Sequence, residues 1–359
     1  MSTPSGENTP WLTVGIAAYN SAAYIRRAIN SVVRQTDSRV EVIIVNDGSR
    51  DNTLARIHDL LASYNEPTRQ RITLIDQDNA GVAAVRNIAI DRSRAPYITF
   101  LDGDDYWLDH YYDSVLSLTG DPAQAEFDLL EYNVLEDRRL LEPDQKAGRF
   151  VRFNPLGNYR GELSTEHLKS IFTASKWYVW TRIYRKSLFD GLRFPRELHY
   201  EDMMLVPQLY LRARTIIATE DPLIAYRINL GGQVCNPAQR DIDDVSRIID
   251  IHLNIARKSS GHARDLMVLL ACQSALYFKI MTNIRLGYIG SLGPIRRRLA
   301  TIQPMLASSR IKLPMKTRLL FMSPLASNLY TWLKTRPQAL KKIKALPGLR
   351  KASAARQHV

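Results

Sequence analysis

Short apolar runs alternate with helix-period segments through the first 130 residues of this 359-residue chain. This alternation constrains the fold strongly, because it is typical of a mostly parallel sheet wrapped by helices. We expect strands at residues 13–18, 40–45, 72–75 and 97–101. Between the first two strands, apolar residues at i, i+3, i+4 and i+7 predict a helix that packs on the sheet, namely Ile25, Ala28, Ile29 and Val32.

Three of the expected strands end in clusters of polar residues. Parallel strands bring their carboxyl ends to one edge of a sheet, and open α/β sheets bind ligands in the crevice at that edge. The chain contains neither G-x-G-x-x-G nor G-x-x-x-x-G-K-[ST], so the two common glycine-rich devices for holding phosphates are excluded. We therefore expect one shared site of a different kind, built from Tyr19-Asn20, Asn46-Asp47 and Asp102-Gly103-Asp104.

A divalent cation is the remaining obvious device for holding phosphates at this edge. Asp102 and Asp104 flank a glycine at a strand end, and two carboxylates there suit Mg²⁺ or Mn²⁺ bridging a diphosphate. Arg86, in the expected helix before them, could add a charge-assisted contact to the same phosphates. Each feature also has a plainer interpretation, namely an ordinary turn, a helix cap or a solvated arginine.

In their order along the chain, these and further motifs resemble the inverting family 2 glycosyltransferases of GT-A fold. This nucleotide-sugar-dependent class builds bacterial polysaccharides, including exopolysaccharides. The resemblance covers roughly residues 10–235. Each motif alone is weakly specific, whereas the ordered set is strongly specific: Val14 to Asn20, Gln35-Thr36, Glu41 to Thr53, Asn79-Ala80-Gly81 with Arg86-Asn87, Phe100 to Asp105, and Tyr200-Glu201-Asp202.

The resemblance implies a nucleotide-sugar site with a Mn²⁺ or Mg²⁺ ion. Asp104 would coordinate the metal directly, and Asp102 would contact the ribose or a metal-bound water. Asn46 departs from the family pattern, which usually has an aspartate there; an amide both donates and accepts, so it can still read a pyrimidine edge. The donor-binding residues implied are Ala18, Tyr19 and Asn20 over the base, Asn46 and Asp47 at uracil and ribose, Arg86 at the diphosphate, and Asp102, Gly103 and Asp104.

The resemblance also implies that Asp202 is the general base and that Glu201 supports it. Both precede an expected helix over residues 203–213, and consecutive helical side chains diverge by about 100°, so only one can aim at the acceptor hydroxyl. The plain alternative is that both acids only stabilise the first turn of that helix. A single in-line displacement needs one base and no protein nucleophile.

The acceptor side and a lid are expected between and after these motifs. Trp177, Trp180 and Arg182 are candidate acceptor residues, because aromatic faces pack against sugar rings, although core positions explain them equally well. Tyr226 and Arg227 precede a glycine-containing loop over residues 231–233, where the family has a mobile segment over the donor. We assign these two residues a lid role.

The net charge of +13 is distributed unevenly along the chain. Asp265 is the last acidic residue, and residues 266–359 contain 17 Lys or Arg, whereas residues 1–265 carry 32 basic and 36 acidic side chains. The tail also has an apolar stripe with helical spacing at Leu325, Leu329, Trp332 and Leu333. This composition predicts a helix in the interface of an anionic membrane, unless the stripe packs on the catalytic domain and the charges are solvated.

The chain is expected to contain one α/β domain followed by a helical, basic extension. The first ten residues lack an apolar core typical of a signal peptide, the most apolar stretch (266–278) is too short to span a bilayer, and two cysteines make no disulfide framework. We expect a cytoplasmic protein, peripheral on the inner membrane. The expected regions are a flexible terminus (1–10), a GT-A domain (11–235) with a nucleotide-sugar half (11–130) and an acceptor half (131–235), a helical region (236–345) and a basic flexible tail (346–359).

The function expected from this sequence is metal-assisted transfer of a sugar from a UDP-sugar to a glycan hydroxyl in cell-surface polysaccharide synthesis. The acceptor is expected to be lipid-linked. One alternative is a sugar nucleotidyltransferase, which uses a related sheet and releases pyrophosphate. Another is a basic nucleic-acid-binding protein, although the tail lacks a recognised reading motif and no nucleic-acid partner is expected. A catalytically inactive relative is a further alternative.

Overall fold

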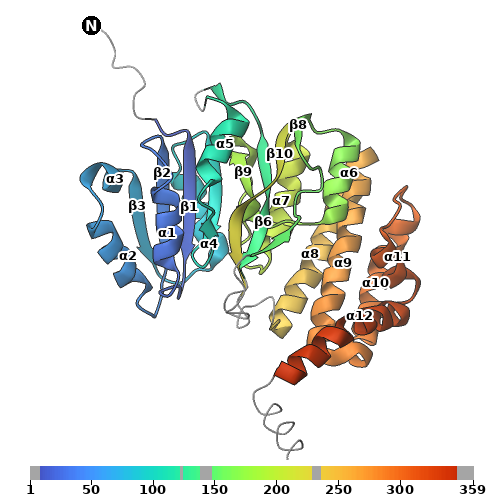
Figure 1. Ribbon diagram of the computed structural model, residues 1–359. Helices are drawn as coiled ribbons and strands as arrows, with labels where there is room; N and C mark the ends of the chain where they lie inside the picture. Colours follow the sequence, from blue (N-terminus) through green and yellow to red (C-terminus); the bar gives the residue numbers. More distant parts are fainter. Residues whose placement is uncertain (1–8, 122–123, 138–147, 229–235, 346–359) are drawn as a thin grey trace, which may run out of the picture. The chain divides into compact units, whose positions relative to one another are not determined.

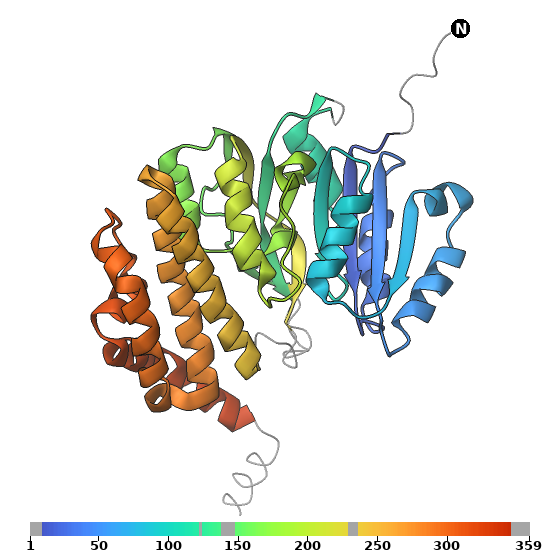
Figure 2. The ribbon, with the colours of Figure 1, turned by 180° about the vertical axis from the view of Figure 1, so that it is seen from behind.

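The structure is a computed structural model that describes residues 9–121, 124–137, 148–228 and 236–345, the last eleven of these by backbone only. The chain divides into two compact units, an α/β unit (Met1–Cys235) and a helical unit (Asn236–Val359). Figures 1 and 2 show the two units from opposite sides. The predicted flexible termini, 1–10 and 346–359, lie almost entirely outside the described residues.

The α/β unit is built around one sheet, which has ten strands among the described residues. Its strand order is β3-β2-β1-β4-β9-β6-β10-β5, with β7 beside β6 and β8 beside β10. The strands are β1 (Leu12–Ala18), β2 (Val40–Asp47), β3 (Ile72–Gln77), β4 (Tyr97–Asp102), β5 (Tyr106–Trp107), β6 (Leu129–Asp137), β7 (Arg149–Val151), β8 (Tyr159–Glu162), β9 (Arg182–Arg185) and β10 (Thr215–Arg227).

The first four strands are parallel and confirm the four predicted strands within two residues at each end. β1 and β2 are almost wholly buried, as expected where helices cover both faces of a parallel sheet. Figures 1 and 2 show α1 on one face and α4 on the other. The helices of this half are α1 (Ile25–Val33), α2 (Thr53–Ala62), α3 (Glu66–Gln70), α4 (Val82–Arg92) and α5 (Tyr111–Thr119).

The strand order reverses between β1 and β4, because the chain builds outward to β3 and then returns to the other side of β1. Beyond β4 the sheet is mixed: β9 runs antiparallel to β4 and β6, whereas β10 runs parallel to β6. The predicted mostly parallel arrangement therefore applies to the first four strands. This half also contains α6 (Thr165–Ala174), the short 3₁₀ helices η2 (Val179–Thr181) and η3 (Lys186–Phe189), and α7 (Glu201–Arg212).

The helical unit consists of five described helices, which confirms the expected helical extension. Its longest helix, α9, is long and apolar enough to span a membrane, but 72% of its most apolar window is buried inside the fold. It packs mainly against α8, and its last turn is bent at Gly287. The helices are α8 (Gln239–Lys258), α9 (Gly261–Gly290), α10 (Leu292–Ala307), α11 (Met315–Met322) and α12 (Pro324–Ala345).

Candidate active site

The carboxyl ends of β1, β2 and β4 lie at one edge of the sheet, where the strand order reverses. Ligands of open α/β sheets bind in such a crevice. The loop after β1 is held to the loop after β2, since the Asn20 amide donates to Ser49 Oγ and Asn20 Oδ1 accepts from the Arg50 amide. Beside this pair, Ala18 is buried and Tyr19 is 48% exposed. The structure thus brings together the polar clusters that the sequence predicted at one edge.

Asn46 and Asp47 are buried and make hydrogen bonds within the protein. Asn46 donates to Asp76 Oδ1 and accepts from Ser49 Oγ. The Asp47 carboxylate accepts from Gln77 Nε2 and from the backbone amides of residues 80 and 81, at 2.6–2.9 Å. Asp47 therefore holds the loop that leads into α4, and Asn46 links the end of β2 to β3 and to the loop after β2.

Arg86, in α4, lies buried at the centre of the site. Its guanidinium pairs with Asp102 at the end of β4, at 3.0 Å, and with Glu201 at the start of α7. Glu201 and Arg86 are nearly inaccessible, whereas the Asp102 side chain keeps 30% of its surface. The arginine thus joins three elements that are far apart in the sequence, with one of its carboxylate partners open to solvent.

Asp202 follows Glu201 in the first turn of α7 and is only partly buried. One of its oxygens accepts from the Met203 amide at 2.7 Å. Burial, and then the negative charge of Glu201, raise the pKa of Asp202 to about 7, although Arg86 acts in the opposite sense. Tyr200, which precedes α7, has a φ of 60°, a left-handed conformation that costs a non-glycine residue about 1–3 kcal/mol and is frequent at functional sites.

The turn after β4 packs tightly on β1. The Gly103 amide donates to Ala17 O at 2.8 Å, and a Cβ at position 103 would lie 2.7 Å from that oxygen, so only glycine fits this backbone. Next to it, burial and the Asp102 carboxylate raise the pKa of Asp104 to about 6. Burial and the same neighbouring acids also raise the pKa of Asp105.

The chemistry of this turn fits a divalent cation. Asp102 and Asp104 are mutually repelling carboxylates whose charges a cation would neutralise, and Mg²⁺ and Mn²⁺ prefer such oxygen ligands. Among the described residues, no group of three or more His, Cys, Asp or Glu side chains is placed to hold a metal ion. A cation would therefore take one or two protein ligands and complete its shell with phosphate or water oxygens.

Arg227, at the end of β10, fixes the same turn from the other side. Its amide donates to Asp105 Oδ1 and its guanidinium donates to Asp104 O, at 2.8 and 2.7 Å. The buried guanidinium also lies over the ring of Tyr24. The lid role was assigned to Tyr226 and Arg227, and the loop over residues 231–233 that follows them lies outside the described residues. The described contacts of Arg227 are those of a residue that positions the acidic turn.

A row of aromatic rings lies beside the acidic residues. Trp180 stacks on Tyr226 with ring centroids 5.2 Å apart, and Tyr178 packs against Trp180 and stacks on Phe153. Burial, and then the nearby Asp202, raise the pKa of Tyr178 to about 12; burial, and then the carboxylates of the turn, also raise the pKa of Tyr226. Tyr178 and Tyr226 are partly exposed, whereas Trp180 is 4% exposed. The accessible members of the row are thus its tyrosines.

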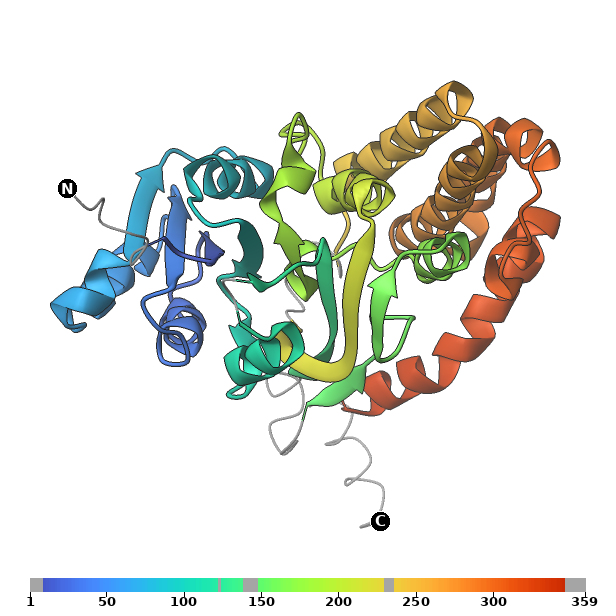
Figure 3. The same cartoon turned by 90° about the horizontal axis from the view of Figure 1, so that it is seen from above.

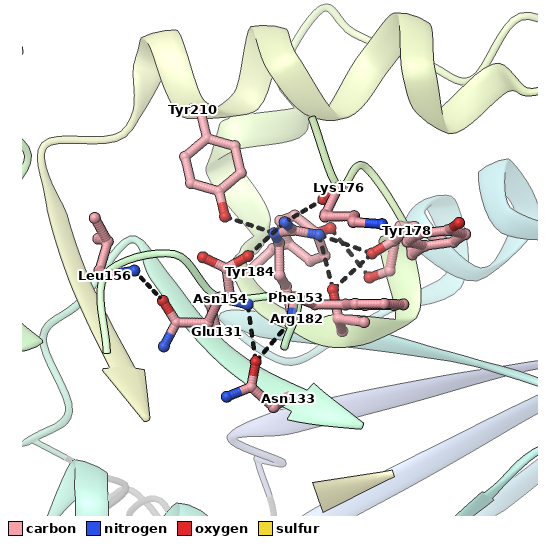
Figure 4. A network of polar contacts seen from close by, with 12 residues as sticks. Glu131, Asn133, Phe153, Asn154, Leu156, Lys176, Tyr178, Arg182, Tyr184 and Tyr210 are labelled. Carbon is pink, nitrogen blue, oxygen red and sulfur yellow. Dashed lines mark hydrogen bonds and ion pairs between the residues drawn. The ribbon is translucent and has the colours of Figure 1, made fainter. Parts of the chain in front are cut away.

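Arg182, one of the three predicted acceptor residues, is enclosed in the network shown in Figure 4. It pairs with the fully buried Glu131 at 2.5 Å and donates to Tyr210 and to the backbone oxygens of Lys176 and Tyr178. Its exposed fraction is 1%. Trp177 is also buried, against Phe172. Trp177, Trp180 and Arg182 are therefore packed as core residues in the structure. Arg182 also holds the segment that carries Tyr178, through its bond to the Tyr178 carbonyl.

The partners that organise the site could not be predicted from the sequence. The pairs Arg86–Glu201 and Arg227–Asp104 join residues more than 110 positions apart, and spacing in the chain holds no signal for such contacts. Glu201 was named only as a support for Asp202, yet it is the buried counterion of Arg86. Tyr178 lies between Trp177 and Trp180 in the sequence, but its accessibility depends on the fold.

The acidic turn and the half-buried Asp202 lie where the strand order of the sheet reverses. This arrangement is that of a ligand-binding α/β protein. Residues 13–186 match the family described as Glycosyl transferase family 2, so this chain contains a glycosyl transferase family 2 domain. Two Bacillus subtilis (strain 168) proteins named as glycosyltransferases, EpsH and EpsJ, are 31% and 32% identical to it. The matches cover 63% and 61% of this chain, and the chain spans less than two thirds, 63% and 62%, of the relatives' own length.

The fold is that of a solved relative. The crystal structure of residues 1–349 of Staphylococcus aureus TarS superposes with a TM-score of 0.61 over 91% of both chains, at 19% sequence identity. This similarity covers the helical region as well as the sheet. It confirms the predicted GT-A fold with a helical C-terminal extension.

Proposed function

We propose that this protein is an inverting glycosyltransferase that moves a sugar from a nucleotide-sugar donor, with a UDP-sugar as the first candidate, to a hydroxyl of a glycan acceptor. TarS is named a poly(ribitol-phosphate) beta-N-acetylglucosaminyltransferase, and its solved complexes contain UDP-GlcNAc and UDP. The supporting observation in this chain is the position of Asp202. A partly accessible carboxylate with a pKa of about 7 lies close to Arg86 and Asp102 at the edge where such ligands bind.

In the proposed reaction, the acceptor oxygen attacks the anomeric carbon on the face opposite the nucleotide. The hydroxyl proton passes to the Asp202 carboxylate, a new carbon–oxygen bond forms, and the bond from the anomeric carbon to the phosphate oxygen breaks. A base is most effective when its pKa lies near the working pH, which suits the raised value at Asp202. An α-linked donor would give a β-linked product, and the nucleoside diphosphate would leave.

The protein's own charges would hold the donor. Asp104 and Asp102 would hold a Mn²⁺ or Mg²⁺ ion, which when bound would neutralise negative charge on the diphosphate. Arg86 is placed by two carboxylates, so its guanidinium is oriented before any ligand arrives, and such preorganised charge stabilises a leaving group effectively. Asn46 and Asp47 would act by holding the loops around the base, in keeping with their internal hydrogen bonds.

The acceptor would lie against the aromatic row. Tyr178 and Tyr226 are partly exposed rings close to Asp202 and Asp104, and sugar rings pack on aromatic faces. A lipid-linked glycan in bacterial cell-surface polysaccharide synthesis is the acceptor that we favour. This choice would place the enzyme in the cytoplasm, at the inner face of the membrane.

The test is a screen of nucleotide sugars with Mn²⁺ or Mg²⁺, beginning with UDP-GlcNAc and a panel of aryl glycosides as acceptors. We expect release of a nucleoside diphosphate and, by proton NMR, a β-anomeric product. Asp59→Asn, an exposed change on α2, should match the wild type and serves as the control. Release of pyrophosphate would establish a nucleotidyltransferase instead. Turnover with retained anomeric configuration would contradict the proposed displacement.

A further inference from the structure

Helix α12 is packed with its polar side inward and its apolar side outward. Ser327 and Asn328 are buried, at 2% exposure, whereas Leu325, Leu329 and Leu333 are 54–56% exposed. Trp332, on the same side as the leucines, is 40% exposed. Figure 3 shows α12, in red, continuing from α11 as a long helix. A surface helix normally has the opposite arrangement, with its apolar stripe facing the core.

The orientation of α12 is fixed by specific bonds to α9. Buried Lys279 donates to the backbone oxygen and hydroxyl of Ser327 and to Thr331 Oγ1, at 2.8–2.9 Å. Asn283 donates to Asn328, which in turn donates to the Tyr288 carbonyl. Rotating the helix to bury its leucines would leave the Lys279 ammonium without these acceptors, and a buried unpaired charge is costly. The apolar stripe therefore stays outward in the folded protein.

The charges around the stripe select its partner. Lys316, Arg318 and Lys334 are exposed on α11 and α12. The sequence of α12 adds four further basic residues before Ala345, and the chain contains no acid after Asp265. A second copy of this chain would bring one basic surface against another. An anionic bilayer complements both features, because lipid headgroups attract the cations and the acyl boundary accepts the leucines and the tryptophan.

We propose that the α12 face formed by Leu325, Leu329, Trp332 and Leu333 inserts into the interface of an anionic membrane. Lys279 and Asn283 act as its internal supports, because they hold the polar side of α12 against the fold. Membrane binding by this face does not depend on sugar transfer being the reaction. It assigns to one face of one helix the membrane affinity that the basic composition only suggested.

The test is co-sedimentation of the full chain with vesicles of phosphatidylcholine, with and without about 30 mol% phosphatidylglycerol. We expect binding to the anionic vesicles that weakens with salt, and little binding to the neutral ones. Leu329→Ser/Leu333→Ser should weaken anionic-vesicle binding at least about tenfold, because two partly exposed leucines lose their contact with the acyl boundary. Phe150→Ser, which removes an exposed aromatic from the α/β unit, is the matched control and should bind like the wild type.

Two results would overturn the proposal. The first is equal vesicle binding by the wild type and the double leucine variant, with unchanged melting temperatures. The second is a wild-type dimer in light scattering that the double variant abolishes, with no vesicle binding, which would assign the stripe to a second copy. Because Leu329 and Leu333 are both more than half exposed and belong to no buried core, the double variant should fold.

Discussion

The sheet edge and helix α12 depart from ordinary packing in opposite ways. At the sheet edge, charged groups are buried or half-buried: Arg86 lies between two carboxylates, and Asp104 and Asp202 have raised pKa values. On α12, uncharged polar groups are buried and leucines face outward. Both arrangements cost stability in the protein alone. The comparison indicates that each of these surfaces is completed by something outside the chain, a charged ligand in one case and an apolar boundary in the other.

Within the α/β unit, two buried arginines differ in how far their carboxylate partners are exposed to solvent. Arg182 is closed off, with a partner that is 0% exposed and five described donor contacts to protein atoms. Arg86 shares one partner, Asp102, with solvent. We therefore expect Arg182 to matter first for folding, and Arg86 to matter for both folding and activity.

The largest expected effect on stability is that of Arg182→Met. Removing the guanidinium leaves Glu131 buried and uncompensated, and breaking such a pair from one side costs about 3–5 kcal/mol. Urea unfolding measures this loss. The double change Arg182→Met/Glu131→Leu removes both charges and should recover most of it. If the single change costs less than about 1 kcal/mol, the pair is not the closed structural unit described above.

A smaller effect on stability, about 2 kcal/mol, is expected for Arg86→Met, because partly exposed Asp102 can turn to water while Glu201 cannot. Activity should fall about 10²-fold or more, since a preorganised charge at the diphosphate is lost. Arg86→Lys should restore part of the stability but little activity, because an ammonium cannot pair with two carboxylates in the same fork geometry. Full activity in Arg86→Met would contradict the role at the diphosphate.

The next effect concerns pH. The pKa values of Asp104 and Asp202, about 6 and about 7, are raised above the ordinary 3.8, so these groups hold protons in the folded state that the unfolded chain has released. Their contribution to the free energy of unfolding is full below a pH of about 4 and is lost as pH rises through the two raised pKa values. Metal-free protein should therefore melt at a lower temperature at about pH 7.5, which lies above both pKa values, than at about pH 5, which lies below both.

Two controls accompany this measurement. Asp104→Asn/Asp202→Asn should weaken the dependence on pH, because two of the titrating groups are gone, while Asp105, whose pKa is also raised by burial, remains. Added Mn²⁺ should raise the melting temperature more at the higher pH, where the carboxylates are ionised and can bind it. An equal effect of Mn²⁺ on the double variant would place the ion elsewhere.

Much of the first half of the fold could be predicted from the sequence, because its signals are local. The strands from Leu12 to Asp102 are short apolar runs, and polar clusters follow them directly. The same pattern predicted that Asn20, Asp47 and Asp102 would meet at one edge. In the second half, β9 pairs with both β4 and β6, and no local periodicity indicates which distant strand is a partner. The strand pairing of the mixed sheet beyond β4 therefore could not be predicted from the sequence.

In the candidate site, too, residues of local motifs could be predicted from the sequence, whereas residues that depend on tertiary packing could not. Asp102, Asp104 and Asp202 were identifiable as motif residues, because a few adjacent positions carry the signal. Whether Trp180 and Arg182 face an acceptor or the core depends on tertiary packing, and both proved to be buried. The stripe on α12 was visible in the sequence, but a stripe of this spacing normally faces inward. Only the contacts of Lys279 with Ser327 and Thr331 show that it faces outward.

The central claim is that Asp202 accepts the proton of the attacking hydroxyl. It is tested most directly by the rate of glycosyl transfer for Asp202→Asn, measured beside the wild type at about pH 7.5. Asparagine keeps the size of the side chain and cannot take the proton, so transfer should fall about 10²–10⁴-fold while the fold and donor binding persist. Transfer within about threefold of the wild-type rate, from a variant that binds donor normally, would contradict the claim.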